Sequence, residues 1–149
     1  MTLSFDPATV SIPKGHHIGG QYVELPGTEI EVLRPSDLQH MGMIADGGEA
    51  AVQQAVDAAK KALAQSRWAK IAPRDRAAVL LRFAALIEQN ANYLGQLEAM
   101  GSSRLISMTI ARDAVRTAGV VRYYAEFCDK IEGTVTSTEA NALSIVKHE

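Results

Sequence analysis

Apolar residues recur at the period of an amphipathic helix along three stretches of the chain. The first predicted helix begins at Asp46, whose side chain can cap it. The second should begin at Pro73 and end near Gly101, and the third should span residues 105–131, with Gly133 as a stop just beyond it. The three apolar stripes consist of Val52, Ala55, Val56, Ala59 and Leu63; of Leu80, Phe83, Ala84, Ile87, Leu94 and Leu97; and of Ile110, Ala114, Thr117, Val121, Tyr124, Ala125, Cys128 and Ile131.

Strand-like segments flank the helices on both sides. Residues 18–24 and 29–34 are both strand-like, and the turn-forming sequence at 25–28 predicts that they form one hairpin. Residues 134–136 and 143–146 are rich in β-branched side chains. A lone hairpin is marginal in water, and an unpaired strand exposes free N–H and C=O groups. We therefore expect the front part of a larger α/β protein, whose last strands need a partner from outside this segment.

The composition agrees with an ordinary globular protein and excludes several classes. Hydrophobic residues make up 47% of the chain, charged residues 21%, and the net charge is -2. Because no basic surface is evident, we expect no binding to nucleic acid. The apolar runs are too short to cross a bilayer, and residues 1–13 do not resemble a secretory signal. These features predict a cytoplasmic protein that has no membrane partner.

Two glycine pairs are candidates for a nucleotide-binding loop, but they lack its pattern. Gly19-Gly20 lies inside a predicted strand, and Gly47-Gly48 opens the first helix without a preceding buried strand. Neither belongs to a G-x-G-x-x-G or G-x-x-x-x-G-K-[ST] sequence, in which backbone approaches phosphate. We interpret both pairs as turn or bulge glycines and expect no cofactor-binding residue in this chain.

The cysteine and the adjacent histidines do not predict a catalytic or metal site. Cys128, the only cysteine, lies on an apolar stripe near a helix C-terminus, where the helix dipole disfavours a thiolate. We interpret it as a core residue rather than a nucleophile. His16 and His17 are neighbours on a predicted strand and should point to opposite faces. We therefore expect no catalytic residue and no metal ligand in this chain.

Arginines on the third helix are the most informative polar feature. Arg112, Arg116 and Arg122 recur along it. One interpretation is a helix face in contact with solvent. The other is that some of these arginines line an entrance for an anionic or polar substrate. The spacing alone leaves both interpretations open.

Five motifs follow one another along the chain at characteristic spacings. They read HIGGQYV at 17–23, VLRP at 32–35, VQQAVDAAKKA at 52–62, PRDRAAVLLR at 73–82, and RYYA at 122–125 with DKIEG at 129–133. In this order they resemble the N-terminal part of the aldehyde dehydrogenase family: its opening hairpin, the segment that follows it, the first long helix, the start of the second helix and the end of the third.

The resemblance implies an oxidoreductase that oxidises an aldehyde to a carboxylic acid with NAD or NADP, through a cysteine nucleophile and a glutamate-activated water. It implies an N-terminal arm at residues 1–16, part of the cofactor-binding domain at 17–133 and the first strands of an oligomerisation arm at 134–149. Those strands would join the rest of the polypeptide or other subunits. The family's catalytic and cofactor-binding residues lie outside the matched segment, so we expect this chain alone to be inactive. The alternative is a truncated, non-catalytic homologue that acts as an interaction or assembly module.

By the same resemblance, part of the third helix borders the substrate entrance. The corresponding residues are Arg112, Asp113, Arg116 and Thr117, and two arginines there would favour a polar or acidic aldehyde. The chain departs from the family in two places. The sequence at 34–39 replaces the family's N-P-x-T-G-E. Gly101 stands where some members carry an acidic cation ligand, so no structural cation is expected.

Overall fold

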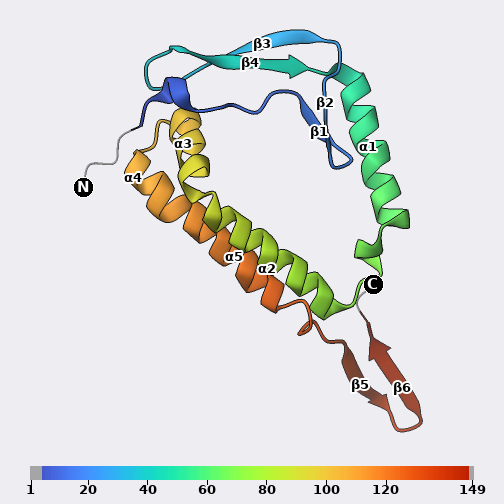
Figure 1. Ribbon diagram of the computed structural model, residues 1–149. Coiled ribbons are helices and arrows are strands. Elements are labelled where there is room, and N and C mark those ends of the chain that lie inside the picture. The colour runs from blue at the N-terminus through green and yellow to red at the C-terminus, as the bar shows by residue number, and fades with distance from the viewer. Residues whose placement is uncertain (1–4, 148–149) are drawn as a thin grey trace.

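The computed structural model describes residues 5–147, which form a mixed α/β arrangement (Figure 1). The strands pair in three antiparallel two-stranded sheets: β1 (His16–Ile18) with β2 (Gln21–Val23), β3 (Thr28–Leu33) with β4 (His40–Asp46), and β5 (Thr134–Glu139) with β6 (Ala142–Val146). The helices are α1 (Gly48–Gln65), α2 (Pro73–Gln89), α3 (Ala91–Ser102), α4 (Ile106–Met108) and α5 (Val115–Glu126), with a π-helical segment at Thr109–Ala114 and 3₁₀ turns at Pro7–Thr9 and Arg67–Ala69.

The predicted single hairpin is wrong, because the N-terminal strands form two hairpins. Ile18 pairs with Gln21, and the glycines between them have φ angles of 62° and 85°, so the pair Gly19-Gly20 makes a tight turn rather than lying inside a strand. β3 instead pairs with β4, which the sequence did not predict. The segment containing Pro26 therefore connects two sheets instead of closing one.

The turn between β3 and β4 is held by local polar contacts. The Arg34 guanidinium donates to both carboxylate oxygens of Asp37, at 2.8 and 2.6 Å. This hydrogen bonding lowers the pKa of Asp37 below its usual value. The next residue, Leu38, has a φ of 58°, and its side chain is 70% exposed. The backbone of this leucine is thus held in the left-handed region, and its side chain makes few contacts that could offset the strain.

α1 begins at Gly48 rather than at Asp46. Asp46 ends β4, and its Oδ1 accepts a hydrogen bond of 3.0 Å from the Gly48 N–H, so this aspartate still serves the start of the helix. The apolar stripe of α1 is largely uncovered, with Val52 63% and Leu63 77% exposed. No helix within residues 5–147 is both long and apolar enough to cross a membrane.

The second and third predicted helices are each interrupted. α2 and α3 are separate helices that meet at Asn90, and α3 ends where predicted, because Ser103 adopts the left-handed conformation. The predicted helix at 105–131 consists of α4, the π-helical segment and α5, and it ends at Glu126. The apolar residues keep their helical spacing through these breaks, so the sequence pattern did not predict them.

The core lies where α2 and α5 pack against each other in opposite directions. Ala84 and Ala118 are fully buried there, beside Ile87. Arg122 of α5 donates to both carboxylate oxygens of Glu88 at 2.9 Å, and this lowers the pKa of Glu88. Small side chains dominate the interior. Within residues 5–147 the buried apolar residues are Ala51, Ala84, Ile87, Ala99, Met100, Ala114, Ala118 and Ala125.

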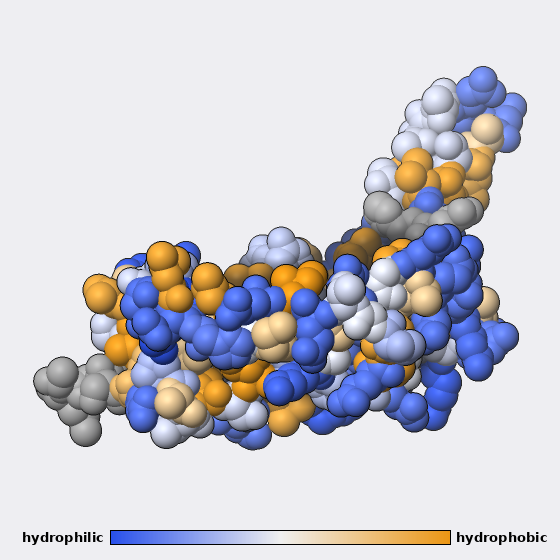
Figure 2. Space-filling model, turned by 90° about the horizontal axis from the view of Figure 1, so that it is seen from above, coloured by the Kyte–Doolittle hydropathy of each residue, from blue (hydrophilic) through white to orange (hydrophobic). Residues whose placement is uncertain are grey.

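The elements are widely spread rather than gathered around one core. In Figure 1, α1 and the α2–α5 pair lie on different sides of the molecule, the β3–β4 hairpin spans them, and the β5–β6 hairpin projects outward. The projecting hairpin leaves Val135, Leu143 and Ile145 more than 60% exposed, and Figure 2 shows apolar side chains on it. Exposed apolar residues therefore cluster on this hairpin instead of being scattered singly.

Candidate functional site

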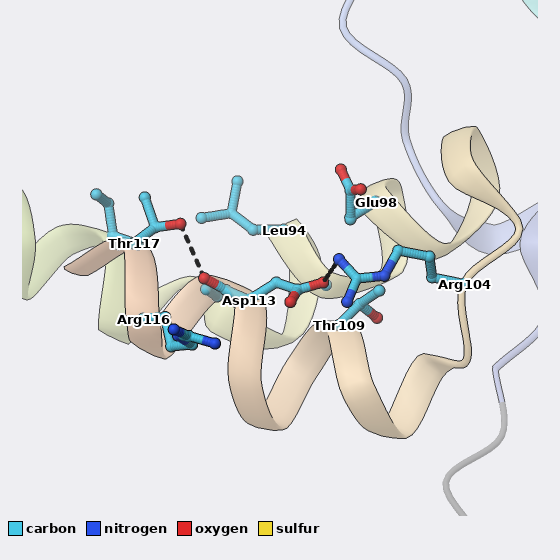
Figure 3. A pocket seen from close by; sticks show the side chains of 10 residues that line it. Leu94, Glu98, Arg104, Thr109, Asp113, Arg116 and Thr117 are labelled. Carbon is cyan, nitrogen blue, oxygen red and sulfur yellow. Dashed lines mark hydrogen bonds and ion pairs between the residues drawn. The ribbon is translucent and has the colours of Figure 1, made fainter. Parts of the chain in front are cut away.

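A pocket of about 680 Å³ opens between α3, the π-helical segment and the start of α5 (Figure 3). It contains three of the four predicted entrance residues, Asp113, Arg116 and Thr117. Arg112 is exposed and does not line the pocket. The lining comprises Ile87, Leu94, Gly95, Glu98, Arg104, Thr109, Asp113, Ala114, Arg116 and Thr117.

The wall of this pocket depends on a close approach of two backbones at Gly95. A Cβ atom at this position would lie 2.6 Å from Ile110 Cγ1 and 2.8 Å from Ile110 Cα and N. Only glycine therefore lets α3 rest directly on the π-helical segment. Thr109 is fully buried beside this contact, and its hydroxyl donates to the carbonyl of Ile106 at 3.2 Å. π-Helical segments are rare, and they occur frequently at functional sites.

Asp113 points into the pocket and forms an ion pair with Arg104 (Figure 3). Its Oδ2 lies 2.6 Å from Arg104 Nη1, but this buried oxygen has no hydrogen bond with suitable N–H geometry. The contact is therefore a close charge pair without a well-directed hydrogen bond. Sequence reasoning missed Arg104, which follows the end of α3 and reaches the pocket only because the chain turns back there.

The remaining polar side chains of the pocket differ in whether they have a partner. The Thr117 hydroxyl donates to the backbone carbonyl of Asp113 at 2.8 Å, so it supports the junction between the π-helical segment and α5. Glu98 and Arg116 form no ion pair with any side chain among residues 5–147. Sequence reasoning also missed Glu98, which is simply one of several charged residues on a helix surface.

Cys128, His16, His17 and His40 do not line this pocket. Cys128 lies two residues beyond the end of α5 and is half-buried, so it is not one of the fully buried core residues, and its thiol is 3.8 Å from the Tyr124 carbonyl oxygen. His17 packs edge-on against Tyr22 with ring centroids 5.4 Å apart. Within the described part of the chain, no three His, Cys, Asp or Glu side chains converge as metal ligands would.

The second glycine pair, Gly47-Gly48, lies at the junction of β4 and α1. β4 runs directly into Gly47 and Gly48, but none of its residues is fully buried, so no buried strand precedes α1. β4 belongs to an antiparallel hairpin, and a Cβ atom at Gly47 would lie 2.6 Å from His16 Nε2. The His16 imidazole therefore packs against Gly47, and a larger residue would not fit at this position. Gly47 and Gly48 form the turn between β4 and α1.

Comparison with known proteins identifies the class to which this fold belongs. A sequence profile of the aldehyde dehydrogenase family matches residues 22–149. The chain is 33% identical over 138 residues to an aldehyde dehydrogenase of Aspergillus niger, which covers 92% of this chain and 27% of that protein. It is 32% identical over 133 residues to the cytosolic 10-formyltetrahydrofolate dehydrogenase of Pongo abelii, with coverage of 89% and 15%.

Solved structures give the same result. The γ-glutamyl-γ-aminobutyraldehyde dehydrogenase of Burkholderia cenocepacia superposes with a TM-score of 0.84 at 34% identity, covering 89% of this chain and 27% of that chain. The P. syringae indole-3-acetaldehyde dehydrogenase in complex with NAD+ and IAA gives a TM-score of 0.85 at 28% identity, covering 93% and 28%. The chain thus belongs to the aldehyde dehydrogenase family and has the fold of its N-terminal part. It spans less than a third of each of these relatives.

Proposed function

We propose that this chain is a segment of an NAD(P)-dependent enzyme that oxidises an aldehyde to a carboxylic acid, and that the chain alone is inactive. Family membership supports the aldehyde-oxidising chemistry. Relatives solved with NAD+ support the cofactor. The sequence contains neither a G-x-G-x-x-G nor a G-x-x-x-x-G-K-[ST] motif, and its single cysteine, Cys128, follows the C-terminal end of α5. The nucleophile, the base and the cofactor site would then be supplied by other polypeptide.

The apolar surface of the chain is the observation that carries this proposal. The stripe of α1 leaves Val52 and Leu63 mostly exposed, and α2 leaves Phe83 and Leu86 more than half exposed. The interior, by contrast, consists mainly of alanines, each of which contributes little apolar area. Such faces need a covering surface, which additional polypeptide of an aldehyde dehydrogenase would provide.

We divide the chain into an N-terminal arm at 1–16, part of the cofactor-binding domain at 17–133 and the start of an oligomerisation arm at 134–149. Residues 1–4 and 148–149 lie outside the described residues. The division between the last two parts is supported by Gly133, beyond which the β5–β6 hairpin leaves the helical body (Figure 1). Its exposed strand edges would pair with the rest of the polypeptide or with another subunit.

The pocket at the π-helical segment is the proposed boundary of the aldehyde entrance. Asp113, Arg116 and Thr117 line it together, which agrees with their proposed role. Arg112 would contribute only if substrate passed over its exposed side chain on the way to the pocket.

A fragment-complementation experiment tests the main proposal. The 149-residue chain would be combined with the Aspergillus niger relative lacking its matching 138 residues. NADH or NADPH formation from an aldehyde panel should occur with the combination and be absent with either part alone. Val52→Asp should abolish the gain by placing a charge on the uncovered stripe of α1. Gln54→Asp, on another face of the same helix, is the matched control and should leave it intact.

A truncated, non-catalytic homologue is the second candidate, and the projecting β5–β6 hairpin favours it. Such a module would bind a full-length family subunit through its strands without adding activity. Molar-mass measurement of a mixture with an intact relative would detect this complex. Titration with NAD is informative for both candidates, since stoichiometric binding to the chain alone would contradict the absence of a cofactor site. Aldehyde oxidation by the chain alone would contradict both.

A further inference from the structure

The pocket beside the π-helical segment contains two charged side chains that form no ion pair within the described chain. Arg104 and Asp113 pair with each other, and the Thr117 hydroxyl is committed to a backbone carbonyl. Arg116 and Glu98 remain without an ion-pair partner among residues 5–147. Figure 3 shows that the Arg104–Asp113 pair lies between them, so their charges act at different parts of the pocket.

The remaining lining suits a short aliphatic chain. Ile87, Leu94 and Ala114 supply apolar surface next to the charged groups. A volume of about 680 Å³ is within the range of small-molecule sites. A guanidinium presents a planar set of donors that matches a carboxylate, whereas Glu98 can only accept hydrogen bonds when ionised. The two charges therefore favour an anionic group beside Arg116 and a donor beside Glu98.

We propose that this pocket binds a small aliphatic carboxylate, with Arg116 as the group that pairs with the anion and Glu98 as the acceptor for an ammonium or amide N–H at the ligand's other end. This rests on the proposed function only in taking the natural ligand to be an aldehyde that carries such a carboxylate. Glu98 repels a second carboxylate, so a monoanion or a zwitterion binds better than a dianion. A purely cationic ligand is rejected by Arg116.

Three probes of similar length test the charge preference without any oxidation step: valerate, pentylamine and δ-aminovalerate. Each would be titrated into the 149-residue chain while NMR follows the amides of Gly95 and Thr117. Valerate should bind saturably and pentylamine should not. δ-Aminovalerate should bind more tightly than valerate. Arg116→Gln should weaken valerate about two- to fivefold, the range expected for a partly exposed ion pair, and Arg116→Lys should restore part of the loss.

Two controls separate the site from general electrostatics. Arg112→Gln removes a neighbouring arginine that does not line the pocket and should leave valerate binding unchanged. Glu98→Gln should remove the advantage of δ-aminovalerate over valerate. The proposal is overturned if valerate shows no saturable binding, if pentylamine binds as well, or if Arg112→Gln and Arg116→Gln have equal effects. Because these probes are not oxidised, binding with no aldehyde oxidation in the complementation experiment would overturn the proposed enzyme and leave this inference standing.

Discussion

Replacing Gly95 by alanine tests whether the pocket wall depends on direct backbone contact. The added Cβ would lie 2.6 to 2.8 Å from three atoms of Ile110, two of which belong to the backbone and cannot rotate away. Overpacking of this kind costs about 1–3 kcal/mol. Alanine recovers up to about 1 kcal/mol because it forms helix more readily than glycine. The free energy of unfolding of Gly95→Ala should therefore be lower than that of the wild type by as much as about 2 kcal/mol.

Gly119→Ala is the matched control in the interior of α5. A Cβ atom there has no neighbour within 4 Å, so only the gain in helix propensity remains. This variant should be about 0.5–1 kcal/mol more stable than the wild type. Urea denaturation of both variants, followed by circular dichroism, measures the difference, which should be about 1–3 kcal/mol. Equal stability of the two variants would refute the close contact between α3 and the π-helical segment.

Two further predictions concern exposed turns and charges. Leu38→Gly should raise the free energy of unfolding by about 1 kcal/mol, because glycine adopts a positive φ without strain. Urea denaturation measures this change. A lower free energy of unfolding would show instead that the Leu38 side chain makes stabilising contacts. The pKa of Glu88 is lowered by the hydrogen bonds from Arg122, so this pair stabilises the fold above the ordinary value of 4.5 and ceases to do so as the pH falls through the lowered value. Glu88→Gln should thus lower the melting temperature at neutral pH and have progressively less effect in acid, whereas a constant difference across pH would contradict the role of this ion pair.

The sequence predicted helices better than strand pairing. Apolar periodicity located α1, α2, α3 and α5, because the apolar residues of each helix lie on one face. It could not reveal the breaks at Asn90 and in the π-helical segment, since the stripe continues through both. The hairpin prediction failed because Pro26 and Gly27 are a stronger turn signal than the Gly19-Gly20 pair that actually closes a turn. β4 was missed because its methionines and glycine are not typical of a strand.

The sequence predicted only those pocket residues that lie close together along the chain. Asp113, Arg116 and Thr117 share one helical segment, so a local sequence comparison could group them. Arg104 and Glu98 come from other elements and reach the same pocket only through the contact of α3 with the π-helical segment. That contact depends on the absence of a side chain at Gly95, a signal that spacing and composition do not contain.

The wide separation of α1 from the α2–α5 pair has a consequence for how the chain unfolds. The main neighbours of α1 are β1 and the turn at Arg67–Ala69, whereas α2 packs chiefly on α5. Unfolding of α1 and its neighbours therefore removes few contacts from the α2–α5 pair, and these two parts should open as separate cooperative units. Backbone amides in α1 should then exchange with solvent deuterium at rates independent of those in α2 and α5. A covering polypeptide would join these units and make a single transition out of two.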